Sequence, residues 1–257
     1  MSDPISQPEL VRQYLGEVSS RLEQLAAEAQ AGALDAAIDL LAGAIAKGGV
    51  VQAFGTGHSE AFAMEVAGRA GGLIPTNKIA LRDVVLHGRQ DVGSLRGSAL
   101  ERDPAVVEEL LDISPVSPED VFIIASNSGV NGSIVGLALL AKAKGHKLIA
   151  VTSLQHTNAV ETKHSSGKRL SEIADVVIDN KAPFGDTTLE VPDGGGIGAV
   201  SSITAAFIAQ LLTIGTARRL AEMGTTPPIY ISANIPGGDE HNQSLEDLYK
   251  DRIRREA

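Results

Sequence analysis

Short apolar segments that each lead into a polar loop and then a helical pattern constrain the fold of this chain most strongly. Residues 121–125 are wholly apolar, lead into the loop 126–132 and are followed by helical spacing over 134–144. The same order recurs at 50–54, before a glycine loop and a helical stretch over 60–70, and at 147–151. A further short strand is expected at 176–178. Near-continuous apolar strands that alternate with helices are typical of a parallel sheet buried on both faces.

We therefore expect residues 1–257 to form a single doubly wound, flavodoxin-like α/β domain, a parallel sheet flanked by helices with an N-terminal helical extension. Residues 1–46 are predicted to be the N-terminal helices, 47–225 the core, and 226–257 a C-terminal tail and helix. A long helix rich in small residues is expected at 198–223 and a last polar helix at 244–254. The polar, glycine-containing stretch 86–104 is predicted to be a long loop.

Composition excludes several classes of function. The chain has no cysteine, so thiol catalysis, disulfides and thiolate metal sites are absent, and its histidines show no metal-ligand spacing. The net charge of −10 argues against a nucleic-acid partner. The first residues do not have the pattern of a signal peptide, and no apolar run approaches the ~20 residues that span a membrane. We expect a cytoplasmic protein with no required metal.

The first candidate loop leaves the strand at 50–54 and reads Gly55-Thr56-Gly57-His58-Ser59-Glu60. Its glycines allow the backbone to approach an anion and the following helix directs N–H groups toward it, although a plain glycine turn has the same pattern. We expect Gly57, His58 and Ser59 to contact a ligand; capping of the helix is the alternative for His58. A dinucleotide fingerprint would need a glycine at position 60 and an acid at the end of the next predicted strand, where Thr76-Asn77 stand. A P-loop is also absent, because no Gly-Lys-Ser/Thr follows either loop. No cofactor is predicted.

The second candidate loop follows the strand at 121–125 and reads Ser126-Asn127-Ser128-Gly129-Val130-Asn131-Gly132. Hydroxyl groups and free backbone N–H groups at the start of a helix are donors for phosphate oxygens, and no lysine or arginine is needed. Helix capping by Ser128 or Asn131 is the alternative. Ser126, Asn127, Ser128, Gly129 and Asn131 are predicted to bind the ligand, together with Ser153 at the end of the next strand.

These loops resemble the two motifs of sugar-isomerase (SIS) domain proteins, Gly-x-Gly-x-Ser and Ser-x-Ser-Gly-x-Thr/Ser/Asn, each at a strand end. The resemblance covers roughly residues 35–225. It is greatest to the phosphoheptose-isomerase-like branch and looser to the etherase that cleaves N-acetylmuramic acid 6-phosphate. It implies an SIS-type fold, a sugar-phosphate substrate and a homo-oligomer, either dimer or tetramer. It also implies that Ser126, Ser128 and Asn131 hold the phosphate and that Ser59 faces the same group.

Isomerases of this family use a glutamate and a histidine near C1 and C2 of the open-chain sugar. In the phosphoheptose branch the histidine follows a Val-Pro segment on the long helix; here Val191-Pro192 is present, but Gln210 is the nearest polar equivalent. The resemblance leaves Glu60 as the catalytic candidate, with Glu65 in reserve or, alternatively, as a solvated charge. The turn 236–242 adds His241 and Glu240, for which capping by neighbouring polar residues is the alternative.

The predicted activity is abstraction of the C2 proton of an aldose or amino-sugar 6-phosphate. Return of the proton to C1 gives an isomer. Loss of the C3 substituent gives a lyase or dehydratase product, for example from N-acetylglucosamine 6-phosphate, and both outcomes stay open. The alternative is a non-catalytic phosphosugar sensor or regulatory domain, which in SIS-containing regulators follows a helix-turn-helix domain of about 75 residues. Here two apolar-faced helices precede the first strand, which favours the enzyme.

Overall fold

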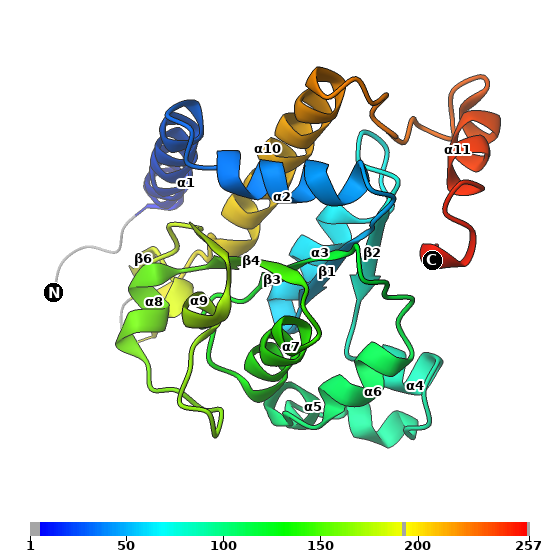
Figure 1. Cartoon of the computed structure of the whole chain (residues 1–257). Helices are drawn as coiled ribbons and strands as arrows, with labels where there is room; N and C mark the ends of the chain where they lie inside the picture. The colour runs from blue at the N-terminus through cyan, green and yellow to red at the C-terminus, as the bar shows by residue number, and fades with distance from the viewer. Residues whose placement is uncertain (1–5, 192–193, 256–257) are drawn as a thin grey trace, which may run out of the picture.

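A computed structural model describes residues 6–191 and 194–255. At its centre lies a five-stranded parallel sheet in the order β2-β1-β3-β4-β5 (Figure 1). The strands are β1 (Val51–Gly55), β2 (Thr76–Ile79), β3 (Val121–Ala125), β4 (Lys147–Thr152) and β5 (Val176–Asp179). This is the flavodoxin-like strand order, and the predicted doubly wound α/β fold is confirmed. The carboxyl ends of all five strands therefore meet at one edge.

Helices cover both faces of the sheet (Figure 1). One face packs against α1 (Gln7–Gln30), α2 (Asp35–Ile45), α3 (Glu60–Val66) and α10 (Ser201–Glu222). The other packs against α4 (Asp83–Leu86), α5 (Ala99–Arg102), α6 (Val106–Asp112), α7 (Gly132–Ala143) and α9 (Leu170–Ile173). The short α8 (Leu154–Ala159) follows β4. No helix of residues 6–191 and 194–255 is long and apolar enough to cross a membrane.

The hydrophobic core consists of two layers because successive side chains of a strand point to opposite faces. In β3, Val121 and Ile123 contribute to the layer beneath α2 and α10, whereas Phe122 and Ile124 contribute to the layer beneath α6 and α7. All four side chains are almost fully buried. This burial on both faces explains why the strands are apolar throughout instead of alternating between apolar and polar residues.

Three segments differ from the sequence-based expectation. The predicted loop 86–104 contains the 3₁₀ turn η2 (Val92–Leu95) and α5. The strand expected to end at Thr76-Asn77 instead begins at Thr76, because the preceding backbone pairs with a distant segment through the bridge Leu73↔Ile229. The last helix, α11 (Gly238–Glu246), begins earlier than predicted, directly after the left-handed Gly237 (φ 78°), and a separate 3₁₀ turn, η4 (Lys250–Arg252), follows it.

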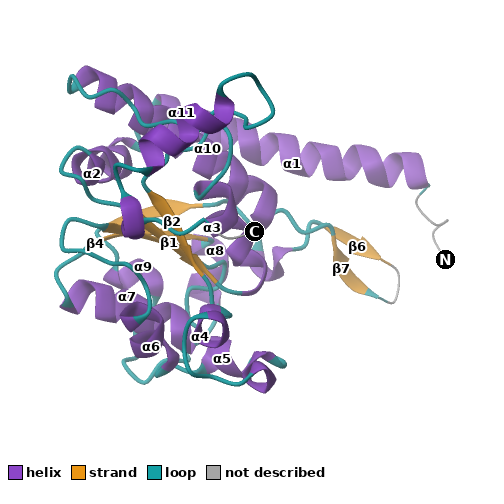
Figure 2. Ribbon diagram, turned by 90° about the vertical axis from the view of Figure 1, so that its right-hand side faces the viewer, coloured by secondary structure: helices purple, strands orange, loops and turns teal. Residues whose placement is uncertain are grey.

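An antiparallel hairpin that the sequence did not predict is formed by β6 (Leu189–Val191) and β7 (Gly195–Ile197). The 3₁₀ turn η3 (Phe184–Asp186) precedes it. The hairpin projects from the body of the protein on the same side as the N-terminal part of α1 (Figure 2). The hydroxyl of Tyr14 on α1 donates to the Ala199 carbonyl at 2.6 Å. The hairpin and α1 are thus linked just before α10 begins.

The C-terminal segment packs on the amino ends of the strands. The Asp120 carboxylate, whose side chain is fully buried just before β3, accepts from Arg252 Nη2 at 2.5 Å and from Gln52 Nε2 at 2.8 Å. It also accepts from the backbone N–H groups of Val50 and Ser117. One carboxylate therefore joins β1, the turn before β3 and the C-terminal segment.

Candidate functional site

The loop after β1 turns too tightly for a side chain at its first position. A Cβ atom on Gly55 would lie 2.6 Å from the Ser59 carbonyl carbon and 3.1 Å from the Glu60 nitrogen. Gly57 has a left-handed backbone (φ +56°) and begins the 3₁₀ turn η1 (Gly57–Ser59), which leads directly into α3. Both glycines are thus required to bring His58 and Ser59 back over the end of β1.

The loop after β3 is held by a hydrogen bond to the hydroxyl of Ser126 and by close packing of Gly129 against two threonines. Ser126 is buried, and its Oγ accepts from the Gly129 N–H at 3.1 Å. Gly129 is left-handed (φ +64°), and a Cβ there would lie 3.1 Å from the Thr157 hydroxyl and 3.2 Å from that of Thr152. Ser128 remains half-buried at the mouth of the loop. The loop presents hydroxyl and amide groups at the start of α7.

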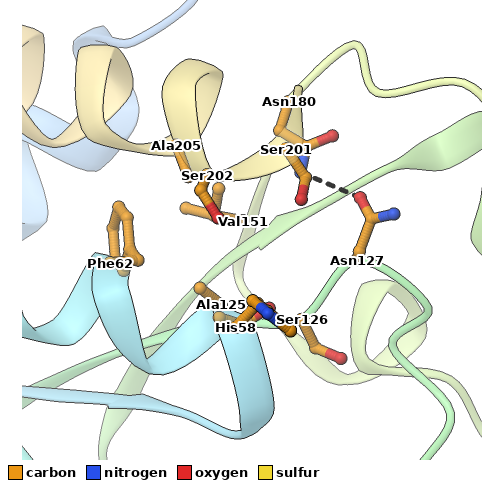
Figure 3. A pocket seen from close by; sticks show the side chains of 11 residues that line it. His58, Phe62, Ala125, Ser126, Asn127, Val151, Asn180, Ser201, Ser202 and Ala205 are labelled. Carbon is orange, nitrogen blue, oxygen red and sulfur yellow. Dashed lines mark hydrogen bonds between the residues drawn. The ribbon is translucent and has the colours of Figure 1, made fainter. Parts of the chain in front are cut away.

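A polar pocket lies between these two loops and the first turn of α10 (Figure 3). Its cavity volume is about 10 Å³, and the empty space of about 260 Å³ among the lining residues includes solvent outside the cavity. The Asn180 amide, after β5, donates to Asn127 Oδ1 at 3.1 Å across one side of the pocket. The polar side chains that line it are those of His58, Ser59, Ser126, Asn127, Asn180, Ser201 and Ser202. The pocket lies at the carboxyl ends of β1 and β3, where the strand order reverses and where open α/β sheets bind ligands.

Glu101, in the segment predicted to be a loop, connects the two loops. Its Oε1 atom accepts from Asn131 Nδ2 at 2.6 Å and from the Thr56 hydroxyl at 3.2 Å. Its backbone carbonyl accepts from the Ser133 hydroxyl at 2.9 Å, which ties α5 to the first turn of α7. A half-buried carboxylate is therefore held by donors from both loops.

The two glutamates predicted on α3 have other partners. Glu60 forms ion pairs with Arg82 and Lys78 beside β2. Glu65 forms an ion pair with Arg69 and accepts a hydrogen bond from Gln210 Nε2 at 2.6 Å. Gln210, on α10, is the nearest polar equivalent of the histidine expected from the resemblance to phosphoheptose isomerases. Like Glu101, neither glutamate is among the residues that line the pocket.

Glu240 and His241 are not brought to the pocket within one chain. They lie on α11, which follows the far end of α10, while the first turn of α10 lines the pocket. A 22-residue helix is about 33 Å long at 1.5 Å per residue. His241 Nε2 is 3.0 Å from the Ile229 carbonyl, in the segment that pairs beside the amino end of β2. In a single chain, then, these two residues lie at the opposite edge of the sheet.

Ser153 also has a different position from the one expected. Its hydroxyl donates to the Ala182 carbonyl at 2.6 Å and accepts from the His156 N–H at 3.0 Å. The side chain is fully buried and caps α8. The hydroxyl therefore donates one hydrogen bond and accepts another within the protein, and we infer that Ser153 holds the segment after β4 in place.

Sequence reasoning missed Glu101, Asn180 and Ser201. The sequence gives a partial indication of two of them. Asn180 follows the predicted strand at 176–178, and Ser201 lies in the first turn of the helix predicted at 198–223. Glu101 has no such signal, because α5 contains only four residues. Within residues 6–191 and 194–255, no group of three His, Asp or Glu side chains is arranged to hold a metal ion.

Comparison with known proteins identifies the class that this fold and site define. The SIS domain pattern matches residues 13–153, more than half of the chain. Curated relatives then narrow the assignment. A UPF0309 protein from Geobacillus kaustophilus is 36% identical over 245 residues, covering 95% of this chain and 96% of the relative. One from Listeria monocytogenes is 39% identical over 240 residues, covering 92% and 94%. The chain belongs to the SIS domain family and, within it, to the UPF0309 proteins.

Solved structures show the same fold at low sequence identity. A phosphoheptose isomerase from Francisella tularensis superposes with a TM-score of 0.55 at 15% identity, covering 83% of this chain and all of that one. The phosphoheptose isomerase of Neisseria gonorrhoeae gives a TM-score of 0.51 at 16% identity, covering 84% and 99%. At such identities the likeness concerns the fold alone.

Proposed function

We propose that this protein binds a sugar 6-phosphate in the pocket and removes the proton from C2 of its open-chain form. The phosphate is expected on the hydroxyl and N–H groups of the 126–131 loop, which faces the start of α7 and takes up an anion without a cation. Ser59 and His58 approach from the other loop. The phosphoheptose isomerases with the same fold act on ligands of this class, which supports the proposal.

The observation that carries the catalytic part is the position of Glu101. Glu101 is not itself among the residues that line the pocket, but its carboxylate is held by Thr56 and Asn131, one from each loop, and Glu60 and Glu65 have no such contact with both loops. We assign it as the general base in place of Glu60. His58, which lines the pocket, is assigned as the proton-transfer partner in place of His241. A base must come within about 3 Å of its proton in the bound state.

Two reactions are open to the enediol or enolamine that forms when the C2 proton is removed: isomerisation and elimination. If the proton from C2 is delivered to C1, with loss of the proton on O2, the product is the 2-keto isomer. If the C3 hydroxyl leaves with a proton as water, a C2–C3 double bond forms and the product is an eliminated sugar. The second course suits an amino sugar whose nitrogen carries an acetyl group, since its C2 amide cannot simply become a ketone.

Exchange of the C2 hydrogen of the recovered sugar 6-phosphate with heavy water tests the proposal, because it reports reversible enolisation before either product forms. The Glu101→Gln and His58→Asn variants should each lower the exchange by ~10²-fold or more. Glu60→Gln and Glu65→Gln serve as matched controls and should retain most of it. Exchange at the wild-type rate in Glu101→Gln would overturn the assignment of the base. Binding of sugar phosphates by the wild type without any exchange would instead favour the non-catalytic sensor.

A further inference from the structure

We propose that the pocket has opposite hydrogen-bond polarity at its two ends and that Ser201 selects what lies opposite the phosphate. On this proposal Ser201 favours a substrate whose non-phosphate end offers a neutral donor, a hydroxyl or an amide N–H. It disfavours a sugar acid that ends in a carboxylate. The inference rests on the proposed function, because it requires the phosphate to lie on the 126–131 loop.

At the phosphate end, the protein leaves polar groups that can donate. Ser126 Oγ already accepts from the Gly129 N–H at 3.1 Å, so its own proton is available for a ligand. Asn127 Oδ1 accepts from Asn180 Nδ2 at 3.1 Å, which leaves the Asn127 amide N–H groups free to donate. A phosphate oxygen only accepts, so this end matches a phosphate.

At the α10 end, the protein fixes the hydroxyl of Ser201 in the opposite sense. Ser201 Oγ lies 2.6 Å from Asp186 Oδ2, and Asp186 Oδ1 accepts from the backbone N–H groups of Ser201 at 2.9 Å and Val200 at 3.2 Å. An ionised carboxylate can only accept, so the Ser201 proton is committed to Asp186. The lone pairs of Ser201 then remain for the pocket that it lines, and it acts there as an acceptor.

The charge of Asp186 adds to this selection. A helix of 22 residues carries a partial positive charge at its start, which by itself would attract an anion. The carboxylate of Asp186 already lies at the start of α10, where it accepts from the N–H groups of Val200 and Ser201. Its backbone is left-handed (φ 58°), a conformation that aspartate adopts more readily than most residues. A ligand carboxylate at this end would meet both a lone pair and a negative charge, whereas a hydroxyl or amide N–H would meet an acceptor.

The Asp186→Asn variant should reverse the polarity with little change of shape. The Asn oxygen can still accept from the two backbone N–H groups, while its NH₂ group donates to Ser201 Oγ and turns the Ser201 proton toward the pocket. Two ligands measure the effect by calorimetry: N-acetylglucosamine 6-phosphate, with a neutral end, and 6-phosphogluconate, with a carboxylate end. The wild type should prefer the first. In Asp186→Asn the ratio of the two dissociation constants should move by about tenfold or more toward the second.

Ser201→Ala is the second variant and leaves Asp186 in place. It removes the acceptor, so it should weaken N-acetylglucosamine 6-phosphate by about tenfold, whereas 6-phosphogluconate, which no longer meets the Ser201 lone pair, should bind no more weakly than to the wild type. Equal effects on both ligands, or an effect on neither, would overturn the role of Ser201. An unchanged ratio in a folded Asp186→Asn protein would overturn the reversal of polarity.

Inorganic phosphate separates this inference from the proposed function. Ser128→Ala should weaken its binding, whereas Asp186→Asn and Ser201→Ala should bind it as the wild type does. If the wild type binds neither phosphate nor either sugar phosphate, the proposed function fails and the inference fails with it. If phosphate binding follows the expected pattern but the two sugar ligands do not discriminate between the variants, the phosphate site stands and only the selection by Ser201 is refuted.

Discussion

The Gly132→Ala substitution tests whether Glu101 must lie between the two loops. A Cβ atom on Gly132 would lie 2.7 Å from the carbonyl carbon of Arg102 and 3.1 Å from the Pro104 nitrogen, and closer still to the Arg102 carbonyl oxygen. An ordinary contact at such a position is 3.4 Å or more, so the backbone beside Glu101 must move by at least 0.7 Å. The Glu101 carboxylate is attached to this segment and must move with it.

A misplacement of about 1 Å at a reacting group can cost ~10²-fold in rate. We therefore expect Gly132→Ala to lower C2 deuterium exchange by roughly that factor, while the affinity for inorganic phosphate stays within a few-fold of the wild type. Overpacking of this kind also costs about 1–3 kcal/mol of unfolding free energy, measured by urea denaturation.

Gly136→Ala provides a matched control one turn further along α7. Its Cβ would lie 3.1 Å from the Pro104 carbonyl oxygen and 3.5 Å from Val107 Cγ1, so a shift of a few tenths of an ångström accommodates it. Wild-type exchange is expected there. If Gly132→Ala exchanges as fast as Gly136→Ala, the close approach of α5 to α7 does not position the base and the reasoning is refuted.

Three further outcomes are expected. The double variant Ser126→Ala/Ser128→Ala should lose phosphate binding in calorimetry, since each lost donor to a charged oxygen costs about 1.5–3 kcal/mol, while its circular dichroism spectrum stays unchanged. Burial by itself would raise the pKa of Asp175, but hydrogen bonds from Lys142 and the Leu148 backbone outweigh it and hold that pKa below 3.8. Asp175 therefore stabilises the fold above its ordinary pKa of 3.8 and loses this effect as the pH falls through its lowered pKa, so the urea stability deficit of Asp175→Asn should be present at pH 7 and shrink as the pH is lowered below 3.8. Light scattering should give a dimer or larger particle rather than 26.7 kDa, because apolar side chains on α1 and α10 such as Leu15 and Ile214 are over 60% exposed in a single chain.

The parts of the fold that the sequence predicted are those with a local signal. The β3 bounds were predicted to the residue, because a strand buried on both faces must be apolar throughout and the polar Ser126 marks its end. The loops after β1 and β3 were predicted for a related reason, since each of these strand ends is followed by glycines and hydroxyls before a helix begins.

The unpredicted parts depend on contacts between distant segments. Glu101 precedes Asn131 by 30 positions, and its role depends on the packing of a four-residue helix that has no periodicity to detect. The turn with Glu240 and His241 has the composition of a catalytic segment, but its position is set by the pairing of 228–230 beside β2, to which its own residues give no clue. The composition of the turn indicated that its side chains can transfer protons. It did not indicate at which edge of the sheet those side chains lie.

The carboxylate of Asp120 has a consequence for the order in which the nascent chain becomes stable. Its charged partner Arg252 lies 132 positions later in the sequence. At the usual synthesis rates of about 5–20 residues per second, Asp120 emerges roughly 7–26 s before that partner. A sheet that closed around Asp120 in this interval would bury a carboxylate without its cation, which is strongly unfavourable. We therefore expect the amino edge of the sheet to stay open to water until Arg252 has been made, and a chain stalled before Arg252 to present that edge to chaperones and proteases.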